Sequence, residues 1–523
     1  MGLEMGDKKK LLLVNPNFKG VVAAPSLGLG FIGTYIREHS DWEVEIIEPI
    51  LQGFSESDTL DKAGDSDIVG LVCYTESRFE CFGFADKVKQ INPACKIIVG
   101  GPHVATLDEK ILQHYRFIDV VVRMEGEETV LDIVNGKPFK KILGITWRNS
   151  EEIIRNLNRP LIEDINNLNY DYSLVYSQIE RWKDFEIPCE LLKLNALPII
   201  VSRGCPFRCA FCASYRQWDQ IYRYCSPEEL VKRIKYLVEK YNVGYFRFYD
   251  ALFAGSNERI LKLCDLFEQA DLGIRFRIDI RVGTSRQILE RLKKVGCEVV
   301  GFGVESGSDR ILKRADKGIT REKVEETIKI CKELGYWMIG FFMISFPDEE
   351  IGDVNKTFEL LKFFDQINIQ FFKLHPNTAF YDELKQKGEI DDEIWFDPKR
   401  GYNTEYGNEI YYCKELFPSA GFYLEEGMAL IDYAYYKYKV SNPREVIRSN
   451  GLFKAVFIIC LSGVMYAVLK PELGRRLYRR FRKTGVYAFL YSAYKRLLNI
   501  KEMGDVPDTE LRRTYKRHKE LIG

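Results

Sequence analysis

Three of the 13 cysteines in this chain of 523 residues have a spacing typical of a metal site, Cys205-x3-Cys209-x2-Cys212. Three thiolates within eight residues can hold an iron–sulfur cube and leave one iron open to another ligand. A zinc site and plain buried thiols are alternatives, but zinc sites use four ligands, and no histidine lies nearby. Cys225 could close the cube as a fourth ligand, although Cys-Ser-Pro before a helix is typical of a helix start. We therefore predict an open [4Fe–4S] site with three cysteine ligands.

The bulk composition is that of a folded chain with more than one domain. Hydrophobic residues make up 46% and charged residues 29%, and Lys+Arg and Asp+Glu are both 76, so the net charge is zero. This balance excludes a disordered chain and gives no overall attraction to nucleic acid. The length predicts two or three domains. The scattered, odd-numbered cysteines and the short opening apolar run LLLV predict reduced thiols in the cytoplasm rather than secretion.

Residues 1–150 alternate short apolar runs with helical stretches, which predicts a doubly wound, Rossmann-like parallel sheet. Ligands of such sheets bind at the carboxyl ends of the strands. Two of those ends read Cys73-Tyr74-Thr75 and Gly100-Gly101-Pro102-His103. The expected strands are 11–16, 42–48, 67–74, 96–101 and 118–123.

The pattern is lost over 151–192, which we interpret as a linker. A second alternating series, 193–400, predicts a partial (βα)6 barrel with its site at the carboxyl ends of the strands. The cysteine triplet directly follows its first expected strand. From 401 to 523 the chain is helical in character, rich in aromatic residues and increasingly basic. The expected barrel strands are 198–202, 244–250, 274–280, 297–304, 336–344 and 367–373.

The run SRGCPFRCAFCAS resembles the signature of the radical S-adenosylmethionine (SAM) superfamily, in which an aromatic residue precedes the third cysteine. The resemblance implies that the open iron chelates SAM and that one electron cleaves the cofactor. The segment FMISFPDEE, residues 342–350, is similar to the FMxGxPGE stretch of the family but lacks its glycines. By the same resemblance, the residues expected to contact SAM are Phe211, Asp250, Arg277, Asp279, Glu305 and Ser306.

The N-terminal half resembles the cobalamin-binding domain of B12-dependent radical SAM proteins, on the residues GGPH at 100–103 and EGEE at 125–128. Those proteins include methyltransferases that act on unactivated carbons and the anaerobic magnesium-protoporphyrin ester cyclase. No Asp-x-His-x-x-Gly motif is present, so His103 need not bind cobalt. A degenerate domain with only a structural role is the alternative. The residues that the resemblance assigns to cobalamin are Thr75, Gly100, Gly101, Pro102, His103, Glu125 and Gly126.

The resemblance, which spans roughly residues 8–380, predicts methyl transfer to an unactivated carbon through a 5′-deoxyadenosyl radical and methylcobalamin. The alternatives are a cobalamin-linked oxidoreductase or cyclase without methyl transfer, and a non-catalytic iron–sulfur protein. The expected partners are a small-molecule or lipid-like substrate and a reductant such as flavodoxin or ferredoxin, with no nucleic acid. No motif identifies the substrate.

The C-terminal region contains the most apolar stretch of the chain, Gly451–Leu469, whose uncharged part of 15 residues is too short to span a bilayer. A basic, aromatic segment follows it. This order predicts peripheral contact of residues 451–496 with an anionic membrane on the cytoplasmic face. A helix buried against the barrel, followed by a solvated basic face, is the alternative.

Overall fold

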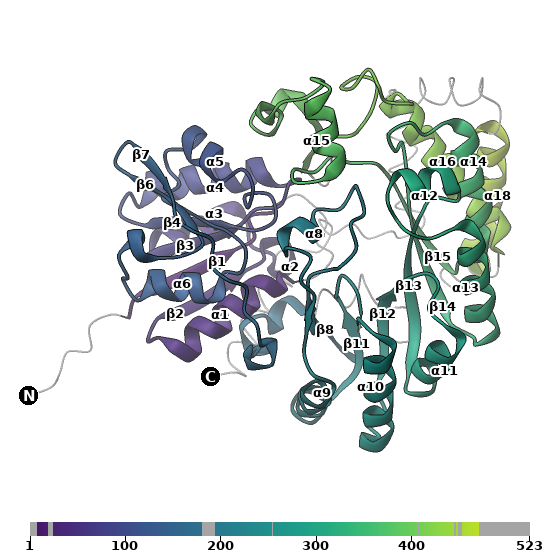
Figure 1. Ribbon diagram of the computed structural model, residues 1–523, viewed down its shortest axis with the longest axis horizontal. Helices are drawn as coiled ribbons and strands as arrows, with labels where there is room; N and C mark the ends of the chain where they lie inside the picture. Colours follow the sequence, from purple (N-terminus) through teal and green to yellow (C-terminus); the bar gives the residue numbers. More distant parts are fainter. Residues whose placement is uncertain are drawn as a thin grey trace, which may run out of the picture.

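Two α/β bodies lie side by side, with a helical segment beyond the second (Figure 1). The structure is a computed structural model that describes residues 8–18, 25–179, 182, 194–253, 255–404, 407–443, 446–447 and 452–469. A seven-stranded sheet forms the first body and a curled, six-stranded parallel sheet forms the second. The predicted fold class, a doubly wound sheet followed by a partial barrel, is confirmed.

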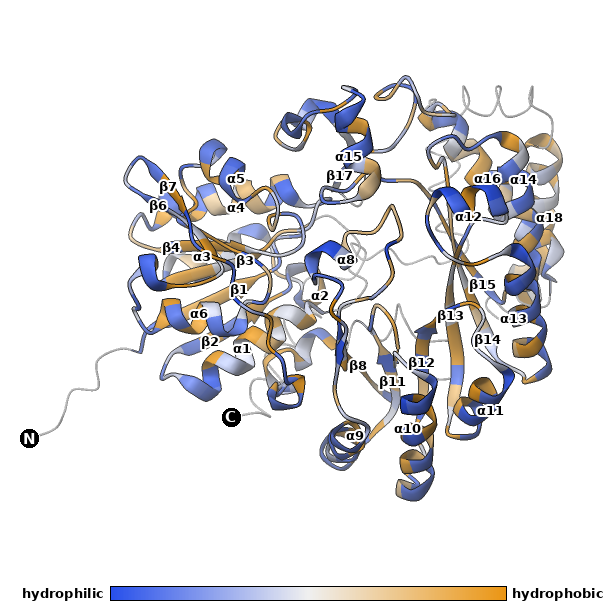
Figure 2. Ribbon diagram, in the orientation of Figure 1, coloured by the Kyte–Doolittle hydropathy of each residue, from blue (hydrophilic) through white to orange (hydrophobic). Residues whose placement is uncertain are grey.

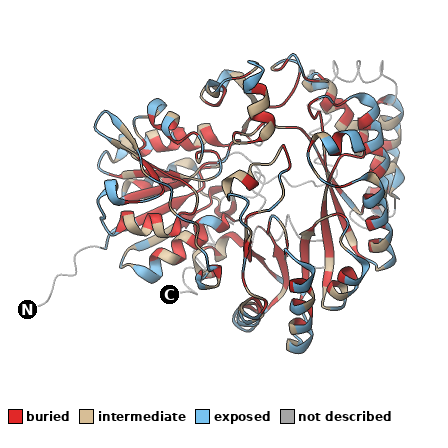
Figure 3. Ribbon diagram, viewed as in Figure 1, coloured by how far each residue is buried: buried red, intermediate tan, exposed pale blue. Residues whose placement is uncertain are grey.

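The first sheet has the strand order β2-β1-β3-β4-β5-β6-β7, and its first five strands are parallel. Helices cover both faces, so strands such as KLLLV are buried along nearly their whole length (Figure 3). The strands are β1 (Lys10–Val14), β2 (Glu43–Ile47), β3 (Ile68–Val72), β4 (Lys96–Gly100), β5 (Val120–Val122), β6 (Ile145–Asn149) and β7 (Glu152–Arg155). The helices are α1 (Leu27–His39), α2 (Pro49–Gln52), α3 (Glu56–Gly64), α4 (Arg78–Ile91), α5 (Asp108–His114) and α6 (Glu127–Val134).

An antiparallel hairpin, β6–β7, extends this sheet beyond the parallel strands that the sequence predicts. The boundary placed at residue 150 falls inside the hairpin, because β7 continues the sheet to Arg155. The two strands of this hairpin, ITWRN and EIIR, are short, and every side chain of β7 is exposed or half-buried, as suits the edge of a sheet. The segment that follows contributes short 3-10 turns at 165–167 and 172–174 before the second body begins.

The second sheet has the order β15-β14-β13-β12-β11-β8, with every pairing parallel. Its apolar strands lie inside a layer of helices whose polar faces point outward (Figure 2). Four of these helices begin at a Ser or Thr whose hydroxyl caps the first turn. The strands are β8 (Asn195–Ile199), β11 (Val243–Phe248), β12 (Arg275–Ile280), β13 (Cys297–Glu305), β14 (Trp337–Ile344) and β15 (Gln366–Phe371). The helices are α9 (Pro227–Tyr241), α10 (Asn257–Ala270), α11 (Arg286–Lys294), α12 (Asp309–Arg314), α13 (Arg321–Glu333) and α14 (Ile351–Leu360).

The first barrel strand lies three residues earlier than the predicted 198–202. The chain leaves the sheet after Ile199, and Ser202–Arg203 forms a two-residue strand, β9, that pairs antiparallel with β10 (Arg223–Tyr224). The prediction that the cysteines directly follow the first barrel strand is therefore wrong, because β9 lies between β8 and Cys205. The cysteine loop then lies between the two paired strands β9 and β10.

The region beyond the barrel is not only helical, in contrast to the prediction for residues 401–523. A hairpin of β16 (Tyr402–Thr404) and β17 (Gly407–Glu409) follows α15 (Ala379–Gln386). Helix α16 (Leu424–Ser441) then packs against β15 and α18 (Leu452–Leu469). None of the helices within the described part of the chain has the length and hydropathy that a membrane crossing requires.

A buried arginine joins the first sheet to the hairpin β16–β17. Arg78, at the start of α4, donates to the carbonyl oxygens of Thr75 (2.7 Å) and Trp395 (2.9 Å) and to both oxygens of Asn408. Its side chain is fully buried, and burial lowers its pKa to about 10, so it remains charged at neutral pH. Arg78 therefore connects segments more than 300 residues apart along the chain.

We expect Arg78→Met to lower the thermal unfolding midpoint by roughly 5–10 °C, since several buried oxygens lose their donor at about 1–3 kcal/mol each. Arg116→Met is the control, because Arg116 pairs with Glu151 on the surface, where both side chains are more than three-quarters exposed. Such exposed pairs contribute about 0–1 kcal/mol. Scanning calorimetry compares the two variants, and equal midpoints would contradict the assignment of Arg78 as an interdomain anchor.

Candidate functional site

The cysteine loop, residues 204–213, runs from β9 to the short helix α8 (Ser214–Gln217). Gly204 begins it with a φ of +91°, and a Cβ at this position would lie 2.0 Å from the carbonyl oxygen of Ile221, so only glycine fits. At the middle of the loop, the Ala210 N–H donates to the Ala315 carbonyl (2.9 Å), and the Phe380 N–H donates to the Ala210 carbonyl (3.1 Å). The loop is thus attached to α12 and α15.

Two cations stand over this loop. The guanidinium of Arg281 lies 3.6 Å from the ring centroid of Phe207, and the ammonium of Lys317 lies 5.7 Å from that of Phe211. Burial raises the pKa values of Cys205 and Cys209, while Arg281 and Lys317 act in the opposite direction on both thiols. The pKa of both thiols stays above its usual value, and the two cations offset part of the cost of burying the thiolates that a metal centre would bind.

The three cysteines are free thiols and interact electrostatically, since Cys212 raises the pKa of both Cys205 and Cys209. Within the described ranges, no three Cys, His, Asp or Glu side chains converge closely enough to hold a single metal ion. Cys225 belongs to another environment, because it is buried in the barrel core and its thiol is influenced by Arg233 and Glu229.

The strand ends inside the barrel contain carboxylate oxygens without hydrogen bonds. Asp250 accepts from the N–H of Val201 (2.9 Å) and from the hydroxyl of Ser202 with one oxygen. Its second oxygen, Oδ2, is buried and has no hydrogen-bond partner among the described residues. Burial raises the pKa of Asp250 to about 6. An unpaired buried oxygen is costly unless a ligand pairs with it, so Asp250 fits a bound molecule that donates hydrogen bonds, as SAM does.

Arg277 and Asp279 lie on one face of β12, opposite the apolar residues that pack under the helices. Arg247 of β11, which the sequence does not single out, donates to Asp279 Oδ2 (2.7 Å). Asp279 Oδ1 is buried and makes no hydrogen bond with the described residues, although Arg277 Nε lies 3.8 Å away. Gly301 gives this carboxylate room, because a Cβ there would lie 2.0 Å from Asp279 Oδ1. The inner face of the barrel thus places a carboxylate, Asp279, next to two guanidinium groups, those of Arg247 and Arg277.

Glu305 ends β13 in a left-handed conformation, with a φ of +66°, and pairs with Lys317 at 2.8 Å. This pair brings the predicted SAM residue Glu305 next to the cysteine loop. Ser306 differs, because its buried hydroxyl lies 3.2 Å from Thr357 Oγ1 and accepts from the Ser308 N–H (3.2 Å). Ser306 therefore holds the turn after β13.

The segment after β14 keeps left-handed backbone at the two positions where the family motif has glycine. Ser345 has a φ of +70° and Asp348 a φ of +67°. The Ser345 N–H donates to the buried carboxylate of Glu349, and its hydroxyl donates to the Tyr412 carbonyl (2.8 Å). Arg314 Nε donates to Asp348 (2.8 Å). These contacts stabilise the left-handed backbone at Ser345 and Asp348, a conformation that glycine would adopt without such support.

A cavity, here called the interdomain cavity, lies between the carboxyl edge of the first sheet and the barrel. Five of the seven residues that the sequence assigns to cobalamin line it: Gly100, Gly101, Pro102, Glu125 and Gly126. Its walls are largely apolar, and Gly101 has a φ of +105° with only 2.8 Å between an added Cβ and the Cys73 carbonyl. Gly101 is therefore required by the close packing of its backbone against Cys73, and the apolar walls of the cavity fit the apolar body of a large ligand. The barrel contributes Ile200, Ser202, Arg203, Gly204, Gln217, Trp218, Tyr249 and Ala251.

Glu125 at this cavity is bound by the opposite domain. Its carboxylate accepts from Arg203, from Arg223 (2.8 Å) and from the Ile162 N–H (2.7 Å). Arg203 also pairs with Glu127. Glu125 therefore positions the cavity wall rather than presenting a free carboxylate. Sequence reasoning missed both arginines, and the adjacency of Arg203 to the Gly204-Cys205 pair was the one local signal.

His103 and Thr75 lie elsewhere. His103 is fully buried behind the sheet edge, where its Nδ1 lies 3.2 Å from Thr75 Oγ1 and its ring meets Trp395 edge-on at 5.7 Å. Burial lowers its pKa well below the usual range, so the ring is neutral. No histidine is among the described residues that line the interdomain cavity. The arrangement thus offers no histidine ligand at this cavity.

A second cavity of about 400 Å³, here called the loop cavity, lies between the cysteine loop and the first sheet. It shares Tyr74 and Pro102 with the interdomain cavity and is bounded on the other side by Cys212. A molecule in the loop cavity would contact both the cysteine loop and the edge of the first sheet. Its lining also includes Thr75, Glu76, Phe211, Ala213, Met343, Gln370, Phe371, Phe372, Lys373, His375 and Pro376.

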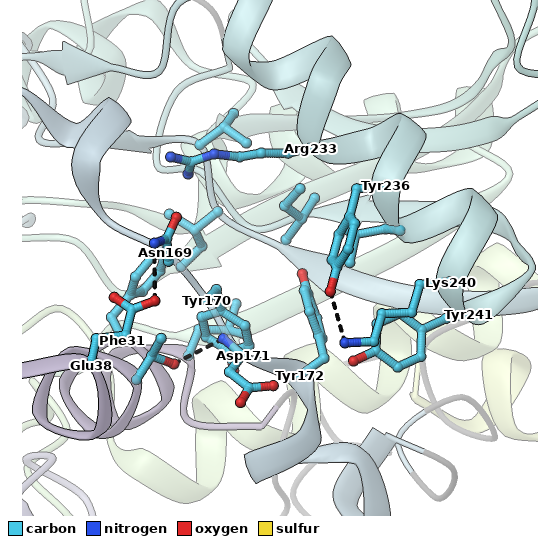
Figure 4. A pocket seen from close by; sticks show the side chains of 16 residues that line it. Phe31, Glu38, Asn169, Tyr170, Asp171, Tyr172, Arg233, Tyr236, Lys240 and Tyr241 are labelled. Atoms are coloured by element: carbon cyan, nitrogen blue, oxygen red, sulfur yellow. Dashed lines mark hydrogen bonds between the residues drawn. The ribbon is translucent and has the colours of Figure 1, made fainter. Parts of the chain in front are cut away.

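A third cavity contains several tyrosines and lies between α1, the 169–172 segment and α9 (Figure 4). Its polar groups pair with one another: Asn169 donates to Glu38 (3.0 Å) and Lys240 donates to the Tyr236 hydroxyl (2.7 Å). None of the three cysteines lines it. The residues around this cavity therefore pack the segment that follows the first sheet against α1 of the first body and α9 of the second.

Comparison with known families agrees with this geometry. Residues 199–361 match the radical SAM superfamily, and residues 20–134 match the B12 binding domain. An uncharacterized methyltransferase of Pyrococcus horikoshii is 30% identical over 381 residues, which cover 69% of this chain and 80% of the relative. An anaerobic magnesium-protoporphyrin IX monomethyl ester cyclase of Rubrivivax gelatinosus is 23% identical over 403 residues, covering 73% of this chain and 71% of the relative.

The fold is shared with a solved structure of the cobalamin-dependent S-adenosylmethionine radical enzyme OxsB, which has aqua-cobalamin and S-adenosylmethionine bound. The TM-score is 0.67 at 16% identity, and the match covers 99% of this chain and 79% of that protein. The sequence matches extend over both α/β bodies, and the predicted resemblance is confirmed. The chain belongs to the radical SAM superfamily, in the group whose members carry a B12-binding domain, and its cofactors are a [4Fe–4S] cluster, SAM and cobalamin.

Proposed function

We propose that this B12-dependent radical SAM enzyme transfers a methyl group from SAM to an unactivated carbon of a small molecule. The observation that carries the proposal is the loop cavity, which has Cys212 on one side and shares Tyr74 and Pro102 with the interdomain cavity on the other. A substrate between a SAM site and a cobalamin site has access to both. The methyltransferase of Pyrococcus horikoshii, similar over most of its length, supports this reaction class.

In this proposal Cys205, Cys209 and Cys212 hold the cluster, and the inner barrel face binds SAM beside Phe211. Asp250 and Asp279 supply the carboxylate oxygens that lack hydrogen bonds, and Arg277 lies beside them. When bound, these cofactors supply one-electron cleavage of SAM and a cobalt centre that carries a methyl group. The protein's own groups orient the reactants and exclude water.

Cobalamin, in this proposal, occupies the interdomain cavity. Gly100, Gly101 and Gly126 line this cavity, while Glu125 fixes its wall through Arg203 and Arg223. His103 is held away by Thr75, so we propose that cobalt has no histidine as its lower ligand.

A cyclisation or oxidation without methyl transfer is the second candidate. The cyclase of Rubrivivax gelatinosus is similar over 71% of its length and supports this alternative. Both reactions use the same cofactors, so the products must distinguish them. Methyl transfer consumes one SAM as methyl donor and a second as radical source, whereas the alternative consumes SAM only as radical source.

We also propose that the C-terminal segment, residues 451–496, contacts membranes peripherally and that the substrate is hydrophobic. Of this segment the structure describes α18, whose Tyr466 stacks on Tyr433 of α16 at 5.4 Å. Another face of α18 exposes Val456, Val464 and Val468. The basic run that follows lies outside the described residues. An apolar face beside a basic segment supports binding at an anionic interface.

The reaction is tested by product analysis under anaerobic conditions with extract-derived small molecules and lipids. Methyl transfer is expected to yield S-adenosylhomocysteine and 5′-deoxyadenosine together, in equal amounts with the methylated product. Deoxyadenosine alone would favour the cyclase alternative. Cys205→Ala, Cys209→Ala and Cys212→Ala should each abolish both products. Cys225→Ala is the control and should keep four irons per chain, because its thiol lies in the barrel core.

The cobalamin site is tested by absorption spectroscopy of protein purified with corrinoid. We expect a base-off spectrum that His103→Ala does not change. Glu125→Gln should weaken corrinoid retention at least about fivefold, because the cavity wall loses charge-assisted hydrogen bonds worth about 1.5–3 kcal/mol each. Glu128→Gln is the control from the same segment, since Glu128 pairs with Arg159 instead. Equal retention by both variants would contradict the role of Glu125.

Membrane contact is tested by flotation with anionic liposomes. The full chain should float at low salt and bind less as salt rises, because the attraction is between surface charges. A chain ending near residue 445 should stay in the soluble fraction. Val464→Asp should reduce flotation, since it places a charge on the exposed face of α18. A full chain that never floats would remove the basis for a lipid-like substrate.

A further inference from the structure

The loop cavity has the size and position of a substrate site. Its volume of about 400 Å³ lies within the range of pockets that enclose small organic ligands. Aromatic and apolar side chains form most of the wall, notably Phe211, Phe371, Phe372 and Met343. Phe211 comes from the cysteine loop, while Met343 and the two phenylalanines end neighbouring strands. A flat, apolar molecular body is well accommodated by such walls.

The cation in this wall is already paired. Lys373 is the one Lys or Arg among the described lining residues, and its ammonium forms an ion pair with the buried carboxylate of Glu409. Glu409 also accepts from the hydroxyl of Tyr411. Behind the wall, Arg78 gives its hydrogen bonds to oxygens of Thr75, Trp395 and Asn408. A phosphate or carboxylate in the cavity would therefore find no cation ready to bind it.

Two acceptor groups do face the cavity. Glu76 follows β3, and its backbone carbonyl accepts from the Asn408 N–H (2.8 Å), which fixes the main chain at this residue. His375, just beyond β15, also lines the cavity, and the Glu76 carboxylate interacts with its ring electrostatically. Among the described residues, neither the Glu76 carboxylate nor the His375 ring has a hydrogen-bond partner.

His375 is neutral in this setting. Burial lowers the pKa of its ring, and the charge of Lys373 acts in the same direction, while the carboxylates of Glu76 and Glu409 oppose them. A neutral imidazole keeps one nitrogen as an acceptor. The cavity thus combines apolar walls with one carboxylate and one imidazole, both able to accept a hydrogen bond from a ligand.

We propose that the loop cavity binds the methyl acceptor, and that this acceptor is a largely apolar molecule that presents an amine or hydroxyl to Glu76 and His375. It carries no phosphate or carboxylate within the cavity, since these groups would face Glu76 without a free cation. The inference deepens the proposed methyl transfer and rests on it for the identity of the ligand as the methyl acceptor. Glu76 and His375 are the residues that determine specificity.

The test uses three probes with the same phenyl body: 2-phenylethylamine, 2-phenylethanol and 3-phenylpropionate. Their binding to the anaerobic holoenzyme is measured by saturation-transfer NMR titration. The amine and the alcohol should bind at least about tenfold more tightly than the carboxylate, because charge-assisted and neutral hydrogen bonds to Glu76 outweigh a like-charge contact.

Variants locate the binding. Glu76→Gln keeps the shape and should weaken the amine about tenfold while changing the alcohol by less than about threefold. His375→Phe should weaken both the amine and the alcohol. Glu109→Gln, an exposed carboxylate on α5, is the matched control and should change neither. Corrinoid retention by each variant confirms that the holoenzyme is intact.

Three results would overturn the proposal: tighter binding of 3-phenylpropionate, equal effects of Glu76→Gln and Glu109→Gln, or no saturable binding of any probe at millimolar concentration. The outcome is separate from that of the proposed function. Selective probe binding without S-adenosylhomocysteine formation would refute methyl transfer and leave the recognition of amines and alcohols standing. Methylated product with an unselective cavity would refute only the substrate class.

Discussion

The arrangement of the site depends on one buried carboxylate, that of Glu125, held by Arg203 and Arg223 of the other domain. Burial alone would raise the pKa of Glu125, but hydrogen bonds and charge from the two arginines lower it below its usual range. A group with a lowered folded pKa contributes stability above its unfolded pKa and loses it as the pH falls through the folded value. The domain junction is therefore fully formed near neutral pH. A buried pair of this kind is costly to break from one side only, because the remaining charges stay desolvated.

This junction also fixes the cysteine loop. Arg203 directly precedes Gly204, which lines the interdomain cavity and cannot carry a side chain. The residue that binds Glu125 thus begins the turn into Cys205, and a shift of one domain would move the loop as well. Arg78 makes the second attachment, on the far side of the loop cavity. With both anchors in place, the distance between the cysteine loop and the edge of the first sheet is set by the fold and not by the substrate.

The sequence predicted the features that depend on residues close together in the chain. Alternating strands and helices, the Ser and Thr helix caps and the cysteine spacing depend on neighbours in the chain, and the two sheets follow from them. The hairpin of β6 and β7 was missed because its strands have only five and four residues. The partners of Glu125 were missed because pairing between residues almost 80 and 98 positions apart leaves no periodicity. Ser345 and Asp348 appeared to break a glycine motif, yet tertiary hydrogen bonds keep the same left-handed backbone at non-glycine residues.

The rigid and the selective parts of the site are built from different residues. The cysteine loop, the glycines of the sheet edge and the anchors Arg78 and Glu125 are held by contacts that a change of substrate does not require to move. Glu76 and His375 lie on loops after strand ends and line the loop cavity. Substitution at such positions alters recognition at little cost to the fold. If the proposed recognition role of Glu76 and His375 holds, a shared frame can carry different substrates, and the chain is similar to both a methyltransferase and a cyclase.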